Sequence, residues 1–139
     1  MLNILLDTDA LVALTKKDDS NRQKAISIYQ KLKENGVQFF LSPFTTAETV
    51  TVLSYRLSHK EAKKFLTEAR KTDLPVLFVE DNAPNLADQW FLKENKKGTS
   101  YFDCYNMALL ERYGKQLNAI FSFDSVYKKN GFKLAEEII

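Results

Sequence analysis

The chain has 139 residues, of which 45% are hydrophobic and 12% aromatic, as is typical of a globular protein that buries its own core. Its single cysteine and single histidine exclude an intrachain disulfide and any cysteine-based or multi-histidine metal site within one chain. The net charge of +2 is too small to indicate a nucleic-acid partner by itself. Catalysis, if present, must therefore use carboxylates, hydroxyls, lysines or arginines.

The sequence contains no apolar run of the roughly 18 residues that a membrane span requires. The amino terminus also lacks the basic start and long apolar stretch of a signal peptide, because the first lysine is Lys16. We therefore expect a cytoplasmic protein that makes no contact with a membrane.

The first part of the chain alternates strand-like and helical patterns. Leu2–Leu6 is an apolar run of strand length, and a brief helix through Leu14 follows it. Asn21–Asn35 has apolar residues at helical spacing and stops at Gly36, a common helix terminator. Val37–Leu41 then predicts a second strand.

Two helices are predicted next. Ser42 followed by Pro43 matches an N-cap with the proline that is favoured in the first helical turn. Another helix begins at Ser58, where Glu61 completes a capping box. Val76–Val79 then predicts a third strand.

The last part of the chain continues the alternation. An amphipathic helix is predicted to end near Gly98, and Ser100–Tyr113 is apolar on most sides, as expected for a helix packed centrally in a layer. Ala119–Phe121 predicts a fourth strand. The final residues are open to two interpretations, a fifth strand around Phe132–Leu134 or a helix over Ala135–Ile139.

This order of elements predicts the fold class. Residues 1–139 contain no linker-like or repetitive stretch, so we expect a single domain. Strands that alternate with helices favour an α/β fold, a three-layer αβα sandwich with a mainly parallel central sheet of four to five strands. In such folds ligands bind at the carboxyl ends of the strands.

Four acids fall at this edge of the predicted sheet. Asp7 and Asp124 directly follow the first and fourth strands. Glu48 lies near the start of the helix after the second strand, and Asp103 lies in the first turn of the late apolar helix. We therefore expect the four carboxylates to converge.

Each acid also has a purely structural interpretation. Asp7 and Asp124 could cap the helices that follow them. Glu48 and Asp103 each stand three residues after a hydroxyl residue, at capping-box spacing. Two of these acids, however, head apolar helix faces, which are formed by Met107 and Leu110 after Asp103 and by Val52 and Tyr55 after Glu48.

Carboxylates at the inner end of a sheet need partners. The sequence shows no obvious basic residue beside any of the four, so they would repel one another unless a cation lies between them. Hard oxygen ligands of this kind favour Mg²⁺ or Mn²⁺.

Four stretches of sequence carry these acids in order along nearly the whole chain: LLDTDALVAL, TTAETVTVL, SYFDCYNMALLERYG and AIFSFDSVYKKNGF. They resemble, in this order, the first to fourth motifs of the PIN-domain ribonucleases. The resemblance implies a metal-dependent endoribonuclease whose catalytic, metal-holding quartet is Asp7, Glu48, Asp103 and Asp124.

Further expectations follow from the resemblance. Thr8 and Ser122 stand where the family has residues that support the site, and for Asp9 we favour a helix-capping role over a supporting one. Small members of this family are often toxins of the VapC type, which implies an RNA substrate, a possible antitoxin partner and a homodimer. Lys128 and Lys129 follow Asp124 and are possible RNA contacts.

Two alternatives remain open at this point. Asp7-Thr8-Asp9 after a strand also matches a haloacid-dehalogenase-type phosphatase, but Leu11 stands where that family has Thr or Val. The chain could also be a PIN fold that binds RNA or protein without cutting.

Four other residues are expected to be structural. His59 is interpreted as a surface residue and Cys104 as core, and Trp90 and Phe91 stand at helical core spacing.

Overall fold

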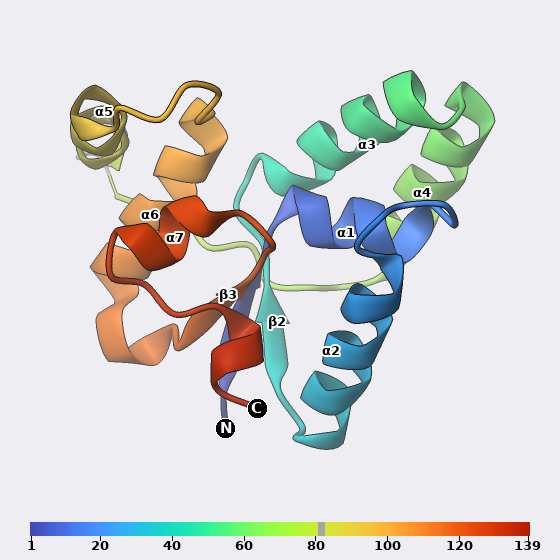
Figure 1. Ribbon diagram of the computed structural model, residues 1–139, viewed down its shortest axis with the longest axis horizontal. Coiled ribbons are helices and arrows are strands. Elements are labelled where there is room, and N and C mark those ends of the chain that lie inside the picture. The colour runs from blue at the N-terminus through green and yellow to red at the C-terminus, as the bar shows by residue number, and fades with distance from the viewer. Residues whose placement is uncertain (81–82) are drawn as a thin grey trace.

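The computed structural model describes residues 1–80 and 83–139 (Figure 1). Its strands are β1 (Asn3–Leu6), β2 (Gln38–Phe40) and β3 (Ala119–Phe121). Its helices are α1 (Thr8–Thr15), α2 (Arg22–Glu34), α3 (Thr45–Arg56), α4 (His59–Lys71), α5 (Ala83–Lys93), α6 (Tyr101–Tyr113) and α7 (Ser125–Lys129), with 3₁₀ turns at Gly114–Gln116 and Ala135–Glu137. Within these residues, no helix has both the length and the apolar composition to cross a bilayer.

The strands form a parallel sheet in the order β2-β1-β3. The central strand pairs Ile4 with Phe39 on one side and with Ala119 on the other. The first strand of the chain thus lies between the second and the last, as a right-handed α/β connection allows. The predicted α/β class with a parallel sheet is confirmed.

The predicted third strand is wrong. Val76 makes a single parallel bridge to Leu41 and extends no ladder. Leu41 is followed at once by Ser42 and Pro43, where the chain turns toward α3, so little partner strand is left to pair with. Phe78 is accordingly 64% exposed.

The predicted fifth strand is also absent from the described residues. Leu134 forms one isolated bridge to Ile120, and the chain then enters a short 3₁₀ turn. The sheet therefore has three strands instead of the four to five expected, and the helical interpretation of the last residues was the closer one.

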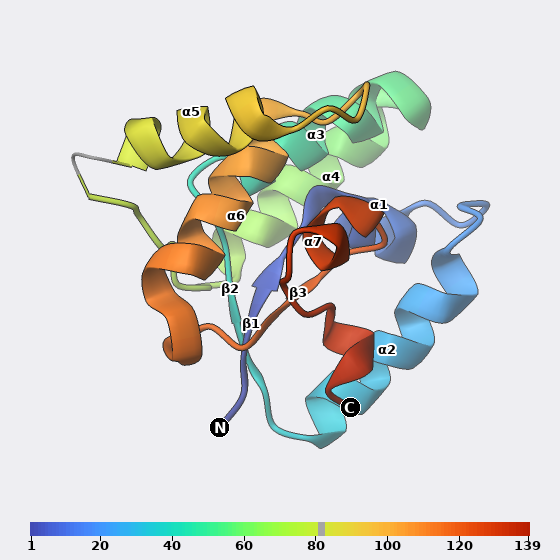
Figure 2. The same cartoon turned by 60° about the vertical axis from the view of Figure 1, so that its left-hand side comes forward.

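Helices cover both faces of the sheet (Figures 1 and 2). Side chains alternate along a strand, so Leu5 and Ile120 pack with α6 and α7, and Ile4 and Phe121 pack with α1 and α2. Both faces of β1 are therefore buried, which explains its nearly continuous apolar sequence.

Capping signals in the sequence predicted the starts of α4 and α6. Glu61 N–H donates to Ser58 Oγ (3.1 Å) at the start of α4, and α2 ends before Gly36, which adopts a φ of 64°. The predicted start of α3 is wrong by two residues. Ser42 Oγ accepts from the N–H of Phe44 (3.1 Å), and this turn precedes the helix.

The predicted end of α5 is also wrong. The helix stops at Lys93, several residues before Gly98. The carboxylate of Glu94, the next residue, accepts hydrogen bonds from Lys129 Nζ (2.9 Å) and Asn130 Nδ2 (3.1 Å) near α7. These bonds fix the start of the connection to α6.

Candidate active site

Asp7 stands at the junction of β1 and α1. Its N–H donates to the carbonyl of Phe121 on β3 (3.1 Å), so the residue continues the parallel ladder. Its Oδ1 accepts from the N–H of Thr8 (2.9 Å), which makes it the N-cap of α1. Its Oδ2 accepts from Ser122 Oγ (2.8 Å), and only 4% of the residue is exposed. Asp7 is therefore both a cap and part of a buried polar cluster.

Asp103 has the same double role. Ser100 and Asp103 form a complete capping box at the start of α6, in which Asp103 Oδ2 accepts from Ser100 N–H (3.1 Å). The other oxygen, Oδ1, lies 3.1 Å from the hydroxyl of Tyr127. Met107 and Leu110 on the same helix are buried, as predicted.

Glu48 is held by a side chain from another helix. Thr8 Oγ1 donates to Glu48 Oε1 (2.6 Å), which joins α3 to α1. The capping-box interpretation is wrong, because Thr45 is already the first residue of α3. The predicted apolar face is also partly wrong, because Tyr55 is 89% exposed, whereas Val52 lines the same cavity as Glu48.

Asp124 follows β3 and caps α7, where its Oδ1 accepts from the N–H of Val126 (2.9 Å). Ser122 Oγ accepts from the N–H of Asp124 (3.1 Å), so this serine connects Asp124 to Asp7. The expectation that no basic residue lies beside the four acids is wrong. Lys96 Nζ lies 3.1 Å from Asp124 Oδ1.

Asp9 is a fifth acid of this cluster. Its Oδ2 accepts from the N–H of Phe123 (3.0 Å) and from Ser122 Oγ (3.3 Å), so it ties α1 to the loop after β3. The favoured capping role therefore does not describe it. Its Oδ1 is buried and has no hydrogen-bond partner among the described residues.

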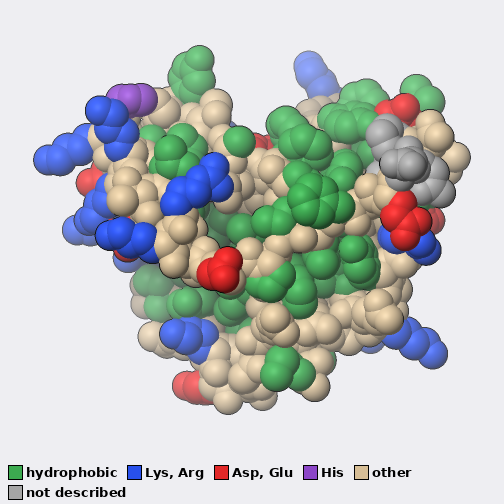
Figure 3. All heavy atoms as spheres, turned by 180° about the vertical axis from the view of Figure 1, so that it is seen from behind, with side chains coloured by type: hydrophobic (Ala, Val, Ile, Leu, Met, Phe, Trp, Pro, Cys, Tyr) green, Lys and Arg blue, Asp and Glu red, His purple; other side chains and the backbone are tan. Residues whose placement is uncertain are grey.

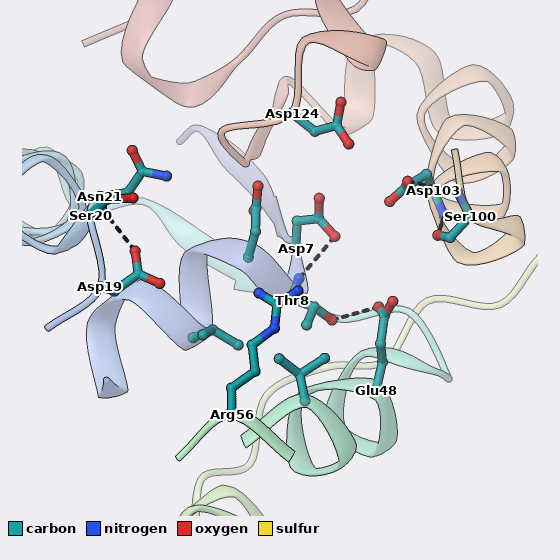
Figure 4. A pocket seen from close by; sticks show the side chains of 13 residues that line it. Asp7, Thr8, Asp19, Ser20, Asn21, Glu48, Arg56, Ser100, Asp103 and Asp124 are labelled. Carbon is teal, nitrogen blue, oxygen red and sulfur yellow. Dashed lines mark hydrogen bonds between the residues drawn. The ribbon is translucent and has the colours of Figure 1, made fainter. Parts of the chain in front are cut away.

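The structure brings all four predicted acids to one cavity of about 350 Å³ (Figure 4). In Figure 4 the carboxylates of Glu48, Asp103 and Asp124 surround a common space beside Asp7. Arg56 also points into it. No three Asp, Glu, His or Cys side chains of the described residues form a ready-made metal site, so an ion would require these acids to draw closer.

Crowding and burial oppose the ionised forms of these acids. Burial raises the pKa of Asp7 well above its ordinary value, and the nearby carboxylates of Asp9 and Asp103 raise it further. Burial also raises the pKa of Asp9 to about 6 and shifts the pKa of Asp103 and Glu48 upward. Positive charge inside the cavity would offset this cost.

The shortage of hydrogen-bond donors for the buried carboxylates also favours a cation in the cavity. Ser122 Oγ is within bonding distance of Asp7 and Asp9, and the Tyr127 hydroxyl is 3.1 Å from both Asp7 Oδ2 and Asp103 Oδ1. A hydroxyl carries one hydrogen, so two hydrogens serve four contacts to three carboxylates. Carboxylate oxygens are the ligands that Mg²⁺ and Mn²⁺ prefer, so this set of residues fits such an ion.

The remaining predicted positions lie outside the cavity. Lys128 and Lys129 are exposed on α7, and Lys129 is paired with Glu94 (2.9 Å). Cys104 is fully buried and His59 is exposed, as expected.

Both aromatics of α5 pack against other rings. Trp90 packs against Phe132 with ring centroids 5.5 Å apart, and Phe91 packs against Tyr101 at 6.1 Å while 45% of it stays exposed.

Sequence reasoning missed four residues around the acids. Asn106 follows Asp103 by three residues on one helix face, and its Nδ2 lies 3.3 Å from Asp7 Oδ1. Arg56 follows Val52 by one helical turn, and Tyr127 follows Asp124 by three residues, so helical spacing could have found both. Lys96 lies in an irregular loop, for which the sequence offers no such signal.

Comparison with known proteins gives a consistent result. The sequence model of the PIN domain matches residues 4–133. The fold is similar to the crystal structure of VapC20 from Mycobacterium tuberculosis, which is described as a toxin that cleaves the sarcin–ricin loop. That similarity has a TM-score of 0.78 and 21% sequence identity, and it covers 94% of this chain and 96% of VapC20. No curated protein is a match in sequence.

Proposed function

This chain belongs to the PIN-domain family, and on that premise we propose that it is a Mg²⁺- or Mn²⁺-dependent endoribonuclease and the toxin of a toxin–antitoxin pair. The observation that carries the proposal is the meeting of acids from four separate segments in one cavity. The haloacid-dehalogenase alternative loses its support, because the family match extends over almost the whole chain.

In this proposal Asp7, Glu48, Asp103 and Asp124 hold the divalent cation. The cation, when bound, offsets the negative charge of the phosphodiester and lowers the pKa of the attacking water. Thr8 orients Glu48 through their 2.6 Å hydrogen bond, and Ser122 fixes Asp7 in the same way. These bonds orient the Glu48 and Asp7 carboxylates, and the ion, on binding, would draw the acids of the cavity closer together.

RNA would approach the cavity past Arg56, the one basic residue among the described residues that line it. Arg56 lies at the end of α3, and its guanidinium suits a phosphate oxygen. The adjacent α4 carries several exposed cations, and Figure 3 shows lysine and arginine side chains gathered near the single histidine, His59. Lys128 on α7 is a second possible phosphate contact.

The likeness to VapC20 suggests the class of RNA. VapC20 is described as cleaving the sarcin–ricin loop, and we propose a structured RNA hairpin loop as the substrate of this chain.

An antitoxin and a second copy of the chain are the proposed protein partners. Figure 3 shows hydrophobic side chains gathered on the face opposite to that in Figure 1, as a protein-binding surface requires. Exposed apolar residues of the molecule include Val76, Phe78 and Phe102.

The experiment is a cleavage assay on a pool of RNA hairpins with Mn²⁺ or with a chelator. We expect cuts only with Mn²⁺, and none with Asp7→Asn or Asp103→Asn at unchanged folding by circular dichroism. Asp73→Asn, which changes an exposed acid, is the matched control and should cut normally. Full activity in both site variants would refute the assignment. Metal-independent RNA binding without any cut would favour the non-catalytic alternative.

The toxin role has its own readout. Expression of the wild-type chain in a bacterial host should arrest growth, whereas Asp103→Asn should not. Normal growth of cells that contain the active wild-type chain would contradict the toxin role. The nuclease proposal would still stand.

A further inference from the structure

Two polar side chains, Asn106 and Tyr127, lie beneath the acidic cavity. They are 3% and 0% exposed and come from α6 and α7. Neither belongs to the lining of the cavity, so neither can touch a bound substrate. Their side-chain hydrogen bonds nevertheless lead to the acids.

Tyr127 joins two acids that are far apart in the chain. Its hydroxyl lies 3.1 Å from Asp7 Oδ2 and 3.1 Å from Asp103 Oδ1. The first acid belongs to the end of β1 and the second to the start of α6. One hydroxyl oxygen therefore links two carboxylates that different elements carry.

Asn106 determines which way this hydroxyl donates. Its Nδ2 lies 3.1 Å from the Tyr127 hydroxyl and 3.3 Å from Asp7 Oδ1, so both amide hydrogens have acceptors. The Tyr127 oxygen thus accepts from Asn106, and its own hydrogen is left to donate to a carboxylate.

The orientation of the Asn106 amide is imposed by the acid. Its Oδ1 is buried and has no hydrogen-bond partner among the described residues. The reversed amide would set this oxygen against Asp7 Oδ1, an acceptor facing an acceptor. Buried polar atoms are rarely left unpaired. Here Asn106 Oδ1 lacks a partner among the described residues, while both amide hydrogens donate, one to Asp7 and one to Tyr127.

We propose that Tyr127 and Asn106 are positioning residues that hold Asp7 and Asp103 in the relative orientation needed to bind a divalent cation. This inference rests on the proposed function, since it concerns the same cavity. Packing alone does not explain the pair, because Phe and Leu would fill these buried positions without an unpaired amide oxygen.

The test is titration of the RNA-free protein with Mn²⁺ by isothermal calorimetry. Tyr127→Phe keeps the buried ring and removes only the hydroxyl. We expect its Mn²⁺ affinity to fall about 10- to 100-fold, the usual effect of losing a partner behind a metal ligand. Asn106→Leu should also weaken Mn²⁺ binding. The double variant should lose less Mn²⁺ binding free energy than the sum of the two single losses.

Tyr105→Phe is the matched control. Tyr105 is a second buried tyrosine, 8% exposed, and its hydroxyl accepts from the N–H of Val79 (3.2 Å) instead of touching an acid. This variant should lower the midpoint of thermal unfolding and leave Mn²⁺ affinity unchanged. Equal losses of Mn²⁺ affinity in Tyr105→Phe and Tyr127→Phe would show a general packing effect and overturn the proposal.

Kinetics separate positioning from catalysis. In RNA cleavage by Tyr127→Phe, the Mn²⁺ concentration for half activity should rise, and kcat at saturating Mn²⁺ should return close to the wild-type value. Wild-type Mn²⁺ affinity in a folded Tyr127→Phe would overturn this inference and leave the proposed function intact. A wild-type protein that binds no Mn²⁺ would overturn both.

Discussion

Lys96 Nζ lies 3.1 Å from Asp124 Oδ1 and 3.3 Å from Ser125 Oγ, so a lysine from the loop before α6 supplies positive charge to the carboxyl end of β3. The pair is partly open to solvent, with 44% of the lysine side chain and 30% of the aspartate side chain exposed. Such pairs contribute at most about 1 kcal/mol. The lysine therefore competes with a cation for Asp124 but does not exclude it.

Lys96→Met should strengthen Mn²⁺ binding, because it removes this competitor. We expect a gain of up to about 5-fold, which corresponds to the energy of an exposed ion pair. Calorimetric titration measures the gain, and Lys97→Met, at the neighbouring exposed lysine, should show no change. A weaker Mn²⁺ affinity in Lys96→Met would mean that the lysine supports the cation instead of competing with it.

Without metal, stability should fall as the pH rises from about 5 to 8. Burial raises the pKa of Asp9 to about 6 in the folded protein, so the folded state binds more protons than the unfolded state in this range. The upward pKa shifts of Asp7, Asp103 and Glu48 act in the same direction. The stability that these groups contribute is fully present below their pKa in the unfolded chain. It is lost as the pH rises through their pKa in the folded protein.

Urea unfolding in the presence of a chelator measures this slope. Glu94 has the opposite behaviour, because Lys129 and Asn130 lower its pKa to about 2, but its contribution changes only below about pH 4.5. Saturating Mn²⁺ should reverse the slope, since ligands must lose protons to bind metal. An unfolding free energy that rises from pH 5 to 8 in chelator would contradict the raised pKa values.

Asp9→Asn should stabilise the metal-free protein at pH 8. The variant keeps an acceptor for the N–H of Phe123 and removes a buried charge, so we expect a gain of about 1–3 kcal/mol in the free energy of unfolding. The gain should shrink at pH 5, where the aspartate already carries a proton. Asp18→Asn, at an exposed acid whose pKa Lys16 lowers, should give no gain and is the control. A loss of stability at pH 8 would show that the negative charge of Asp9 is needed by the fold.

Lys128 and Lys129 should differ in RNA binding. Lys129 is already paired with Glu94 (2.9 Å), whereas Lys128 is exposed on the same helix. The binding is measured in the inactive Asp103→Asn background. There Lys128→Ala should weaken binding about equally for all RNA sequences and reduce the slope of log K against log salt concentration by about 1. Lys129→Ala should have the smaller effect in the same fluorescence-anisotropy titration. The reverse order would show that the pairing with Glu94 breaks when RNA binds.

The sequence was informative where a residue's role depends on its near neighbours. Ser100 and Asp103 form the expected capping box because both partners lie within one helical turn. β1 was recognisable because burial on both faces requires a continuous apolar run.

It failed where distant segments decide the outcome. Val76–Val79 has the composition of a strand, but Leu41 is the last extended residue of its partner, so a single bridge forms. The contact between Lys96 and Asp124 joins residues 28 apart through an irregular loop. No pattern of spacing predicts such a contact.

The paired strands β1 and β3 are more than a hundred residues apart in sequence. Asp7 meets Ser122 across 115 residues and Tyr127 across 120. A growing polypeptide on the ribosome therefore contains Asp7 long before Ser122 and Tyr127, and the acid cluster cannot close until β3 and α7 have emerged. If the folded protein cuts RNA, the nascent chain carries no cutting site until those two elements have been synthesised.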